Sequence, residues 1–306
     1  MMKFNKYGYL VGALMLALGW QSCQVQEDAP GAEQYPILFG KTSARAVAGL
    51  DDLKNNGFKV YAYFAGNAGS ATFEKNVTYK SNQSVWGYEG LEYWMPGVEY
   101  WFKAFYPQTS SAGALNVDNS NSSQSYTITN FDITKQEDIM EATANCKVAV
   151  GASHPESGSV VTLYFDHLLA CVVIEMKSGM DGITINKITL SDVANYGQYE
   201  NGMWSSSNTS SISITSGVSL TKGSDYVDVT HGGLLVIPES VNGQQDLTIE
   251  ASNNKKYDIT LPSGTWEKGN KYTYKAEIKE NDIIFNEPSI SKKWESESAT
   301  GSVIIK

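Results

Sequence analysis

Apolar and polar residues alternate with a period of two in many short stretches of this chain, and this period limits its fold most. Successive side chains of a β-strand point to opposite faces of the sheet, so a half-buried strand requires such alternation. In the stretch "YTYKAEI" four side chains share one face: Tyr272, Tyr274, Ala276 and Ile278. The same pattern predicts strands at 58–64, 161–167 and 247–252. We therefore expect an all-β chain.

Three segments depart from plain alternation. In residues 183–190 the apolar phase changes after Ile185, which predicts a β-bulge near Asn186 and Lys187. Residues 50–57 predict one short helix, with Asp51 as its N-cap and Gly57 after its last turn. Residues 137–144, "EDIMEATA", predict a further helical turn or two.

Strand spacing and chain length together predict two domains. Short strands separated by turns are typical of antiparallel sandwiches, and 306 residues exceed the usual size of one domain. We expect an N-terminal β-sandwich over 35–168 and a C-terminal one over 169–306. Segments rich in serine and threonine, 107–125 and 204–220, are expected to be loops or edge segments.

The first 22 residues have the three parts of an export signal. Lys3 and Lys6 supply positive charge, an apolar core runs over 10–20, and a small residue, Ser22, precedes Cys23. The core is roughly ten residues, whereas a spanning helix needs about 20. Residues 1–22 are therefore predicted to be a cleaved signal peptide.

Cys23 lies just beyond that apolar core, where bacterial lipoproteins carry the cysteine that takes a diacylglyceryl group. We predict lipidation of Cys23, followed by a linker over 23–34 whose acidic residues, Glu27 and Asp28, resemble a signal for surface display. Trp20 stands where a small aliphatic residue is usual, so the alternative is an ordinary signal peptide with an incidental cysteine.

The charge of the chain argues against nucleic acid as a partner, and its cysteines leave one disulfide bond undecided. The formal charge of −10 becomes more negative when the two lysines of the signal are removed, and nucleic-acid-binding proteins carry basic patches instead. Apart from Cys23, the chain has Cys146 and Cys171. Export permits a disulfide between them, whereas the apolar surroundings of Cys171 favour a buried thiol.

No catalytic or metal-binding pattern is present in the sequence. The three histidines, His154, His167 and His231, lie far apart, without the spacing of a zinc site. There is no nucleophile motif and no complete phosphate-binding loop, and the adjacent carboxylates do not define a glycosidase pair. We predict a protein that is not an enzyme and that has no cofactor; a glycosidase is the weaker interpretation.

Aromatic residues concentrate in 85–107, "VWGYEGLEYWMPGVEYWFKAFYP". Two interpretations fit this segment. Exposed aromatic rings could stack on sugars, which would make the chain a glycan-binding surface lipoprotein. In the interpretation that we favour, Phe102, Ala104 and Tyr106 belong to the core, with Trp86 and Trp94 packed across a hairpin.

Several motifs in a fixed order resemble the fimbrillin family, the subunits and accessory proteins of lipoprotein-derived (type V) pili. They are "YWFKAFYP", "DIMEATA", "VVTLYFDHLLACVVIEM", "ITINKITLSDVANYGQYENGMW", "GGLLVIPES", "YDITLPSGTWEKGNKYTYKAEI" and "IIFNEPSISKKW". The resemblance runs from about Tyr35 to the C-terminus. It implies two tandem transthyretin-like β-sandwiches and a structural subunit, accessory protein or anchor of surface fimbriae.

The resemblance also implies a mode of assembly. An arginine-specific protease would cut between Arg45 and Ala46, after a first strand over 35–40, and a neighbouring subunit's strand would refill the groove. The candidate donor is the segment 300–306, with Val303 and Ile305 on one side and Ile304 on the other. Its alternative is an ordinary last strand. The implied partners are other fimbrial subunits, the outer membrane through the lipid, and ligands on host or bacterial surfaces.

Overall fold

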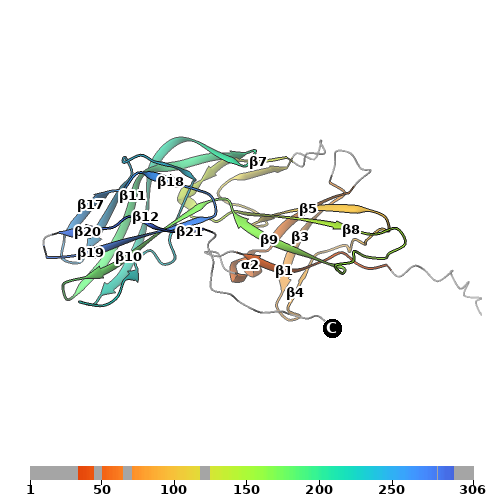
Figure 1. Ribbon diagram of the computed structural model, residues 1–306, viewed down its shortest axis with the longest axis horizontal. Helices are drawn as coiled ribbons and strands as arrows, with labels where there is room; N and C mark the ends of the chain where they lie inside the picture. The colour runs from red at the N-terminus through yellow and green to blue at the C-terminus, as the bar shows by residue number, and fades with distance from the viewer. Residues whose placement is uncertain (1–33, 45–49, 65–70, 118–124, 281, 293–306) are drawn as a thin grey trace, which may run out of the picture.

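The computed structural model describes residues 34–44, 50–64, 71–117, 125–280 and 282–292. In these residues the regular structure is nearly all β-strand, with one short helix and one 3-10 turn, which confirms the predicted all-β class. The strands form two lobes, arranged end to end in an elongated molecule (Figure 1). No helix in this part of the chain is long and apolar enough to cross a membrane.

The elements before the link between the lobes are β1 (Leu38–Ala44), α2 (Leu50–Asn56), β2 (Phe58–Phe64), β3 (Phe73–Lys80), β4 (Val85–Gly87), β5 (Glu99–Tyr106), β6 (Ala114–Val117), β7 (Tyr126–Asp132), the 3-10 turn η1 (Ile133–Lys135), β8 (Met140–Lys147) and β9 (Val160–His167). Those after it are β10 (Ala170–Ser178), β11 (Ile183–Glu200), β12 (Met203–Leu220), β13 (Val227–Asp228), β14 (Leu234–Val236), β15 (Glu239–Val241), β16 (Asp246–Ala251), β17 (Lys256–Thr260), β18 (Gly264–Trp266), β19 (Asn270–Ile278), β20 (Ile283–Phe285) and β21 (Ser289–Lys292).

The first lobe is one seven-stranded sheet in the order β1-β9-β8-β5-β2-β3-β4. The sheet curls around its core: Pro36, just before β1 at one end, bridges to Tyr93, which lies six residues after β4 at the other end. β1 runs parallel to β9, whereas the other pairs of this sheet are antiparallel. The core inside the curl is strongly aromatic and includes Phe58, Phe102 and Phe165.

The second lobe packs two six-stranded sheets face to face around a larger core. One sheet has β10 and β19 at its centre, in a parallel pair. The other is built on the long strand β11, which pairs with β12 along one side and with β16 and β7 along the other. The two strands of the β11–β12 hairpin, each 18 residues long, form one border of this lobe.

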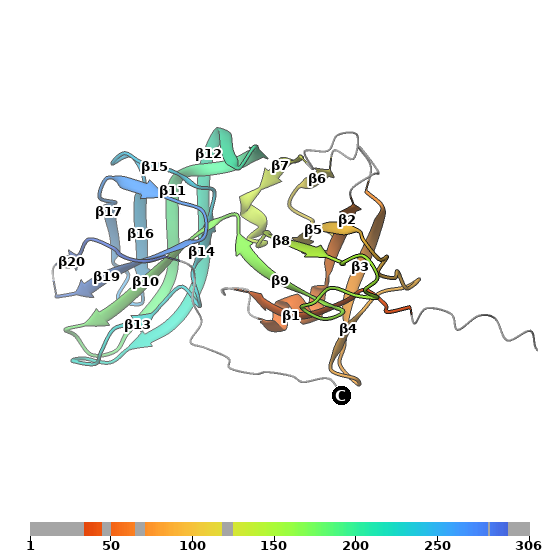
Figure 2. The same ribbon diagram turned by 45° about the vertical axis from the view of Figure 1, so that its right-hand side comes forward.

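Segments that precede the link between the lobes are hydrogen-bonded to segments that follow it. β6 and β7 precede the predicted boundary at 168/169, yet β7 pairs with β11 of the second lobe and lies between the lobes (Figure 2). Gln136 completes a backbone-like bridge, since its Nε2 donates to Leu235 O at 3.0 Å and its Oε1 accepts from Leu235 N at 2.9 Å. The division into sandwiches at 35–168 and 169–306 stays a prediction.

The expected strands are found in the structure. β2, β9, β16 and β19 cover the four alternating stretches, and their apolar faces are buried. The bulge near Asn186 is confirmed, because the pairing of β11 with both neighbours shifts between Ile185 and Lys187.

The two helix predictions had different outcomes. The helix over 50–57 is confirmed as α2, and Gly57 follows it with a φ of +65°, a left-handed conformation that suits glycine. The helix begins at Leu50, so Asp51 lies inside it and does not precede it as an N-cap. The turn predicted over 137–144 is wrong, because Met140 and Ala142 point into the first core from strand β8, which pairs with β5 and β9.

Candidate functional site

The segment at the start of the first lobe lies in a slot with a backbone partner on each side. On one side, Ile37 N donates to Glu92 O at 2.8 Å, and Trp94 N donates to Tyr35 O at 3.0 Å. On the other side, Leu38 N donates to Ser159 O at 3.3 Å, and the parallel ladder with β9 follows. This segment thus completes the sheet as an inserted strand.

Two side chains of the segment reach the core. Ile37 and Phe39 are buried, and their spacing of two places both on the inner face of the strand. The ring of Phe39 lies 5.9 Å from the ring of Phe102 and 5.7 Å from that of Tyr88, centroid to centroid. Without these side chains the curled sheet would have an open apolar groove along β9.

Polar side chains fix both walls of the slot independently of the strand. Trp94 Nε1 donates to Ser159 O at 3.1 Å and so ties one wall to the other. Tyr100 Oη accepts from Met95 N at 3.2 Å, which holds the loop after Trp94. Tyr88 bonds the inserted strand itself, donating to Ile37 O at 2.6 Å. Burial raises the pKa of Tyr88, so it keeps this hydrogen at neutral pH.

The predicted processing site follows the inserted strand directly. β1 ends at Ala44 and α2 begins at Leu50. Arg45 and Ala46 lie between them, outside the described residues, as do Cys23 and the donor candidates Val303, Ile304 and Ile305. The structure therefore tests none of these residues. The structure does show where β1 lies, the strand that cleavage after Arg45 would detach.

One feature of the sequence indicates the processing site more specifically than the family motifs do. Arg45 is the only arginine among the 306 residues, and every other basic side chain is a lysine or histidine. An arginine-specific protease therefore has a single site in the whole chain, immediately after the inserted strand.

The aromatic segment 85–107 serves mainly as core. Trp94, Phe102 and Tyr106 are buried, and Trp86 packs on the same cluster, as we favoured from the sequence. Burial raises the pKa of Tyr106 to about 12, and its hydroxyl accepts from Asn56 Nδ2 at 3.0 Å. These rings are therefore not an exposed platform on which a sugar could stack.

The histidines and cysteines that the sequence singled out have structural contacts. His167 is buried, and its Nδ1 lies 2.7 Å from Oδ2 of Asp138, also buried, at the end of β9 next to the link. Cys146 and Cys171 are free thiols, the first in β8 and the second in the core of the other lobe. Among the described residues, no three acidic, histidine or cysteine side chains gather where they could hold a metal ion.

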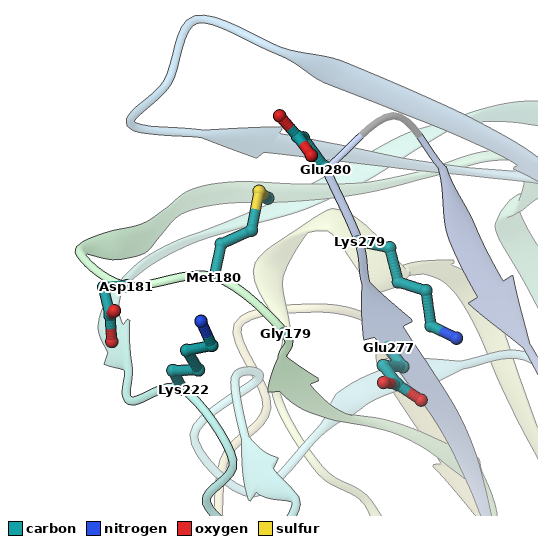
Figure 3. Close-up of a pocket in the computed structure, with 7 residues that line it drawn as sticks. All are labelled: Gly179, Met180, Asp181, Lys222, Glu277, Lys279 and Glu280. Atoms are coloured by element: carbon teal, nitrogen blue, oxygen red, sulfur yellow. The ribbon is translucent and has the colours of Figure 1, made fainter.

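A surface pocket of about 500 Å³ opens in the second lobe, where the chain leaves β10 and β19 (Figure 3). Its lining residues are Gly179, Met180, Asp181, Lys222, Glu277, Lys279 and Glu280. They include three carboxylates, Asp181, Glu277 and Glu280, and two lysines, Lys222 and Lys279, so the pocket presents charges of both signs.

Comparison with known proteins places the chain in a family. The model of the fimbrillin-like family matches residues 45–294, most of the chain. A search of curated proteins finds no match.

Several crystal structures share the fold. A fimbrial protein from Bacteroides vulgatus superimposes with a TM-score of 0.58 at 20% identity, over 84% of this chain and 99% of that one. A candidate cell adhesion protein from Bacteroides uniformis gives 0.52 at 16% identity, over 84% and 98% of the two chains. Another from Bacteroides ovatus gives 0.52 at 12% identity, over 78% and 88%. At these identities the likeness concerns the fold.

Proposed function

The chain belongs to the fimbrillin-like family, and from this premise we propose that it is a structural subunit or accessory component of surface fimbriae that assembles by strand exchange. In this proposal the chain is exported as a lipoprotein and held at the outer membrane through Cys23. Cleavage after Arg45 then detaches the lipid together with the inserted strand. The assembled fimbria has a role in adhesion.

The observation that carries the proposal is the position of Arg45. The chain's only arginine follows directly on β1, which ends at Ala44. A cut at this point removes the whole strand and leaves α2 and the rest of the sheet intact. The sequence offers an arginine-specific protease no other arginine.

The energetics favour refilling of the slot. Full burial of one large apolar side chain contributes about 1.5–3 kcal/mol, so Ile37 and Phe39 together contribute about 3–6 kcal/mol. Loss of the strand exposes this groove and leaves backbone groups of Glu92, Trp94 and β9 without partners. An open sheet edge of this kind is a template for another strand.

The C-terminal segment of a neighbour has a suitable pattern. Val303 and Ile305 are two residues apart, as are Ile37 and Phe39, so a strand over 300–306 would present an apolar pair to the same groove. The walls of the slot are tied together by Trp94 and so stay formed for the incoming strand. A chain that is not cut would keep its strand and its lipid, and would act as an anchor.

Mass spectrometry of the mature N-terminus from native surface material tests the proposal. We expect a chain that begins at Ala46, and an Arg45→Lys variant, which keeps the charge but removes the protease's residue, should retain its first strand. If the native chain begins at an acylated Cys23, the role as a polymerising subunit is wrong and the anchor role remains. A chain that begins at another residue would contradict both roles.

A further inference from the structure

The second lobe has a long strand edge that none of the described strands covers. β12 pairs with β11 along its inner side, and no other strand in the described part of the chain pairs with it. Near its end, His231 Nε2 lies 2.6 Å from Ser216 O and covers the edge there. The open part therefore lies before Ser216.

Within this open part, residues 208–215 form the most regular segment. The extra residues of β12 in its pairing with β11 lie on either side, at about Ser207 and at Ser216–Gly217. Inside the segment the irregularities lie in β11, not in β12. Ile212 and Ile214 face the core, whereas Thr209, Ser211 and Ser213 are exposed. Eight residues of extended backbone thus present an unbroken edge.

The edge lacks the usual chemical protection against pairing. Proteins protect exposed edges with short strands, charged side chains or proline. The other described edge strands of the two large sheets in this lobe follow that rule: β6, β13, β14, β20 and β21 have two to four residues, and β17 has five, including Lys256 and Asp258. All 18 residues of β12 are uncharged and none is proline. The segment 208–215, "NTSSISIT", also contains no glycine.

We propose that residues 208–215 pair with the same segment of a second copy of this chain, antiparallel across a two-fold axis, and so join two second lobes through one continuous sheet. A two-fold axis normal to the sheet keeps each face of the sheet on the same side in both copies. The exposed serine and threonine side chains of one copy therefore lie beside the exposed serine and threonine side chains of the other. Hydroxyl groups both donate and accept hydrogen bonds, so identical strands are complementary. If the edge carried charged side chains, the same charges of two copies would lie opposite each other and repel.

The charge of the whole chain supports this choice of partner. The formal net charge of −10 disfavours contact between most surfaces of two copies, and the uncharged edge of β12 avoids that repulsion. Such pairing is closed, because the two-fold axis uses both edges at once. It links two chains side by side and is independent of the slot that holds β1.

The test compares matched lysine variants in a background that prevents strand exchange. The full exported chain carries Cys23→Ser, which removes the lipid site, and Arg45→Lys, which keeps β1 in place. Thr209→Lys with Ser213→Lys puts two charges on the edge. Ser81→Lys with Asn82→Lys adds the same charge in an exposed turn between β3 and β4. Both pairs of lysines reduce the net negative charge, so general repulsion between copies falls equally.

We expect sedimentation equilibrium to show a concentration-dependent dimer in the background chain and in the turn variant. The edge variant should dissociate at least tenfold more readily, although its net charge is less negative. A monomer at all concentrations would overturn the proposal, as would a dimer that the edge variant leaves unchanged. Thermal melting establishes that each variant is folded.

A cysteine scan of residues 208–215 keeps the proposal testable if the lysine variant does not fold. A two-fold axis normal to the sheet places one residue of the segment opposite itself, so oxidation should give a covalent dimer at that position and little at its neighbours. Ser81→Cys is the matched control. A scan in which no position cross-links above this control would overturn the pairing.

Discussion

A Cβ atom built on Gly40 would lie 2.6 Å from Cγ1 of Val160, so β1 approaches its neighbour β9 at this point as closely as a glycine permits. Val160 is β-branched and stiff at χ1, which limits how it can move away. The close approach lies at the centre of the parallel ladder that holds the inserted strand, where Gly40 pairs with Thr162. The fit of β1 in its slot is therefore sensitive to a single methyl group.

Gly40→Val is expected to weaken the hold of the slot on β1 by about 1–3 kcal/mol, the usual effect of overpacking. Hydrogen exchange should become faster in residues 35–44 and stay unchanged in β19. Gly264→Val in β18 is the matched control, because no atom lies within 4 Å of a Cβ at that position. Equal protection of residues 35–44 in both variants would contradict the close fit.

Gln136→Ala should destabilise the link between the lobes by about 1–3 kcal/mol. The change leaves the N–H and C=O groups of Leu235, a buried residue, without their side-chain partner. Lys135→Ala, on the exposed neighbour, should change stability by less than about 0.5 kcal/mol. Urea denaturation of the two variants measures the difference, and similar midpoints would argue against the bridge.

Glu239 should make the second lobe less stable as the pH rises. Burial raises the pKa of its carboxyl group above the ordinary value of 4.5, although a hydrogen bond from Ala194 N at 3.0 Å opposes this. The folded chain then binds the proton more tightly than the unfolded chain. The stabilisation is complete below pH 4.5 and is lost as the pH rises through the folded pKa.

Glu239→Gln mimics the protonated carboxyl group and keeps an acceptor for Ala194. We expect it to raise the melting temperature at pH 7 and to have a smaller effect at pH 4. Glu200→Gln, at an exposed position, should show no such pH dependence. A Glu239→Gln variant that melts below the parent at pH 7 would show that the ionised carboxylate stabilises the fold, which is the opposite sign.

The two thiols should differ in reactivity. Burial raises the pKa of Cys171 to about 12, and its Sγ lies 3.4 Å from Gly232 O. Burial also raises the pKa of Cys146, but that residue is only half-buried. At pH 8, iodoacetamide should label Cys146 and leave Cys171 intact until urea unfolds the chain. Mass spectra in which neither thiol reacts after unfolding would indicate a disulfide.

Local sequence pattern predicted the strands that lie against a core. In β2 and β19 the alternation of side chains reflects burial of one face, so the strand was readable from neighbouring residues alone. β8 was not, because "EDIMEATA" is rich in good helix formers. Its partners β5 and β9 are distant in sequence, and pairing with them overrides that local preference.

The slot itself could not be predicted from local pattern. Its walls come from residues 92–94 and from β9, which are more than 60 residues apart in the chain. The contact of His167 with Asp138 likewise depends on the pairing of β9 with β8, in which His167 lies opposite Met140. That Arg45 is the only arginine can be read from the sequence alone. That it directly follows the inserted strand requires the position of β1, which ends at Ala44.

The central claim is that cleavage after Arg45 opens a slot that a neighbour's C-terminal strand fills. The most direct measurement is the molar mass of the Cys23→Ser chain before and after digestion with an arginine-specific protease. We predict a series of multimers after cleavage, and none of this series for the Arg45→Lys chain or for a cleaved chain that ends at residue 299. A cleaved chain whose molar mass does not exceed that of the uncut chain at the same concentration would contradict the claim, and so would multimers that form equally well without residues 300–306.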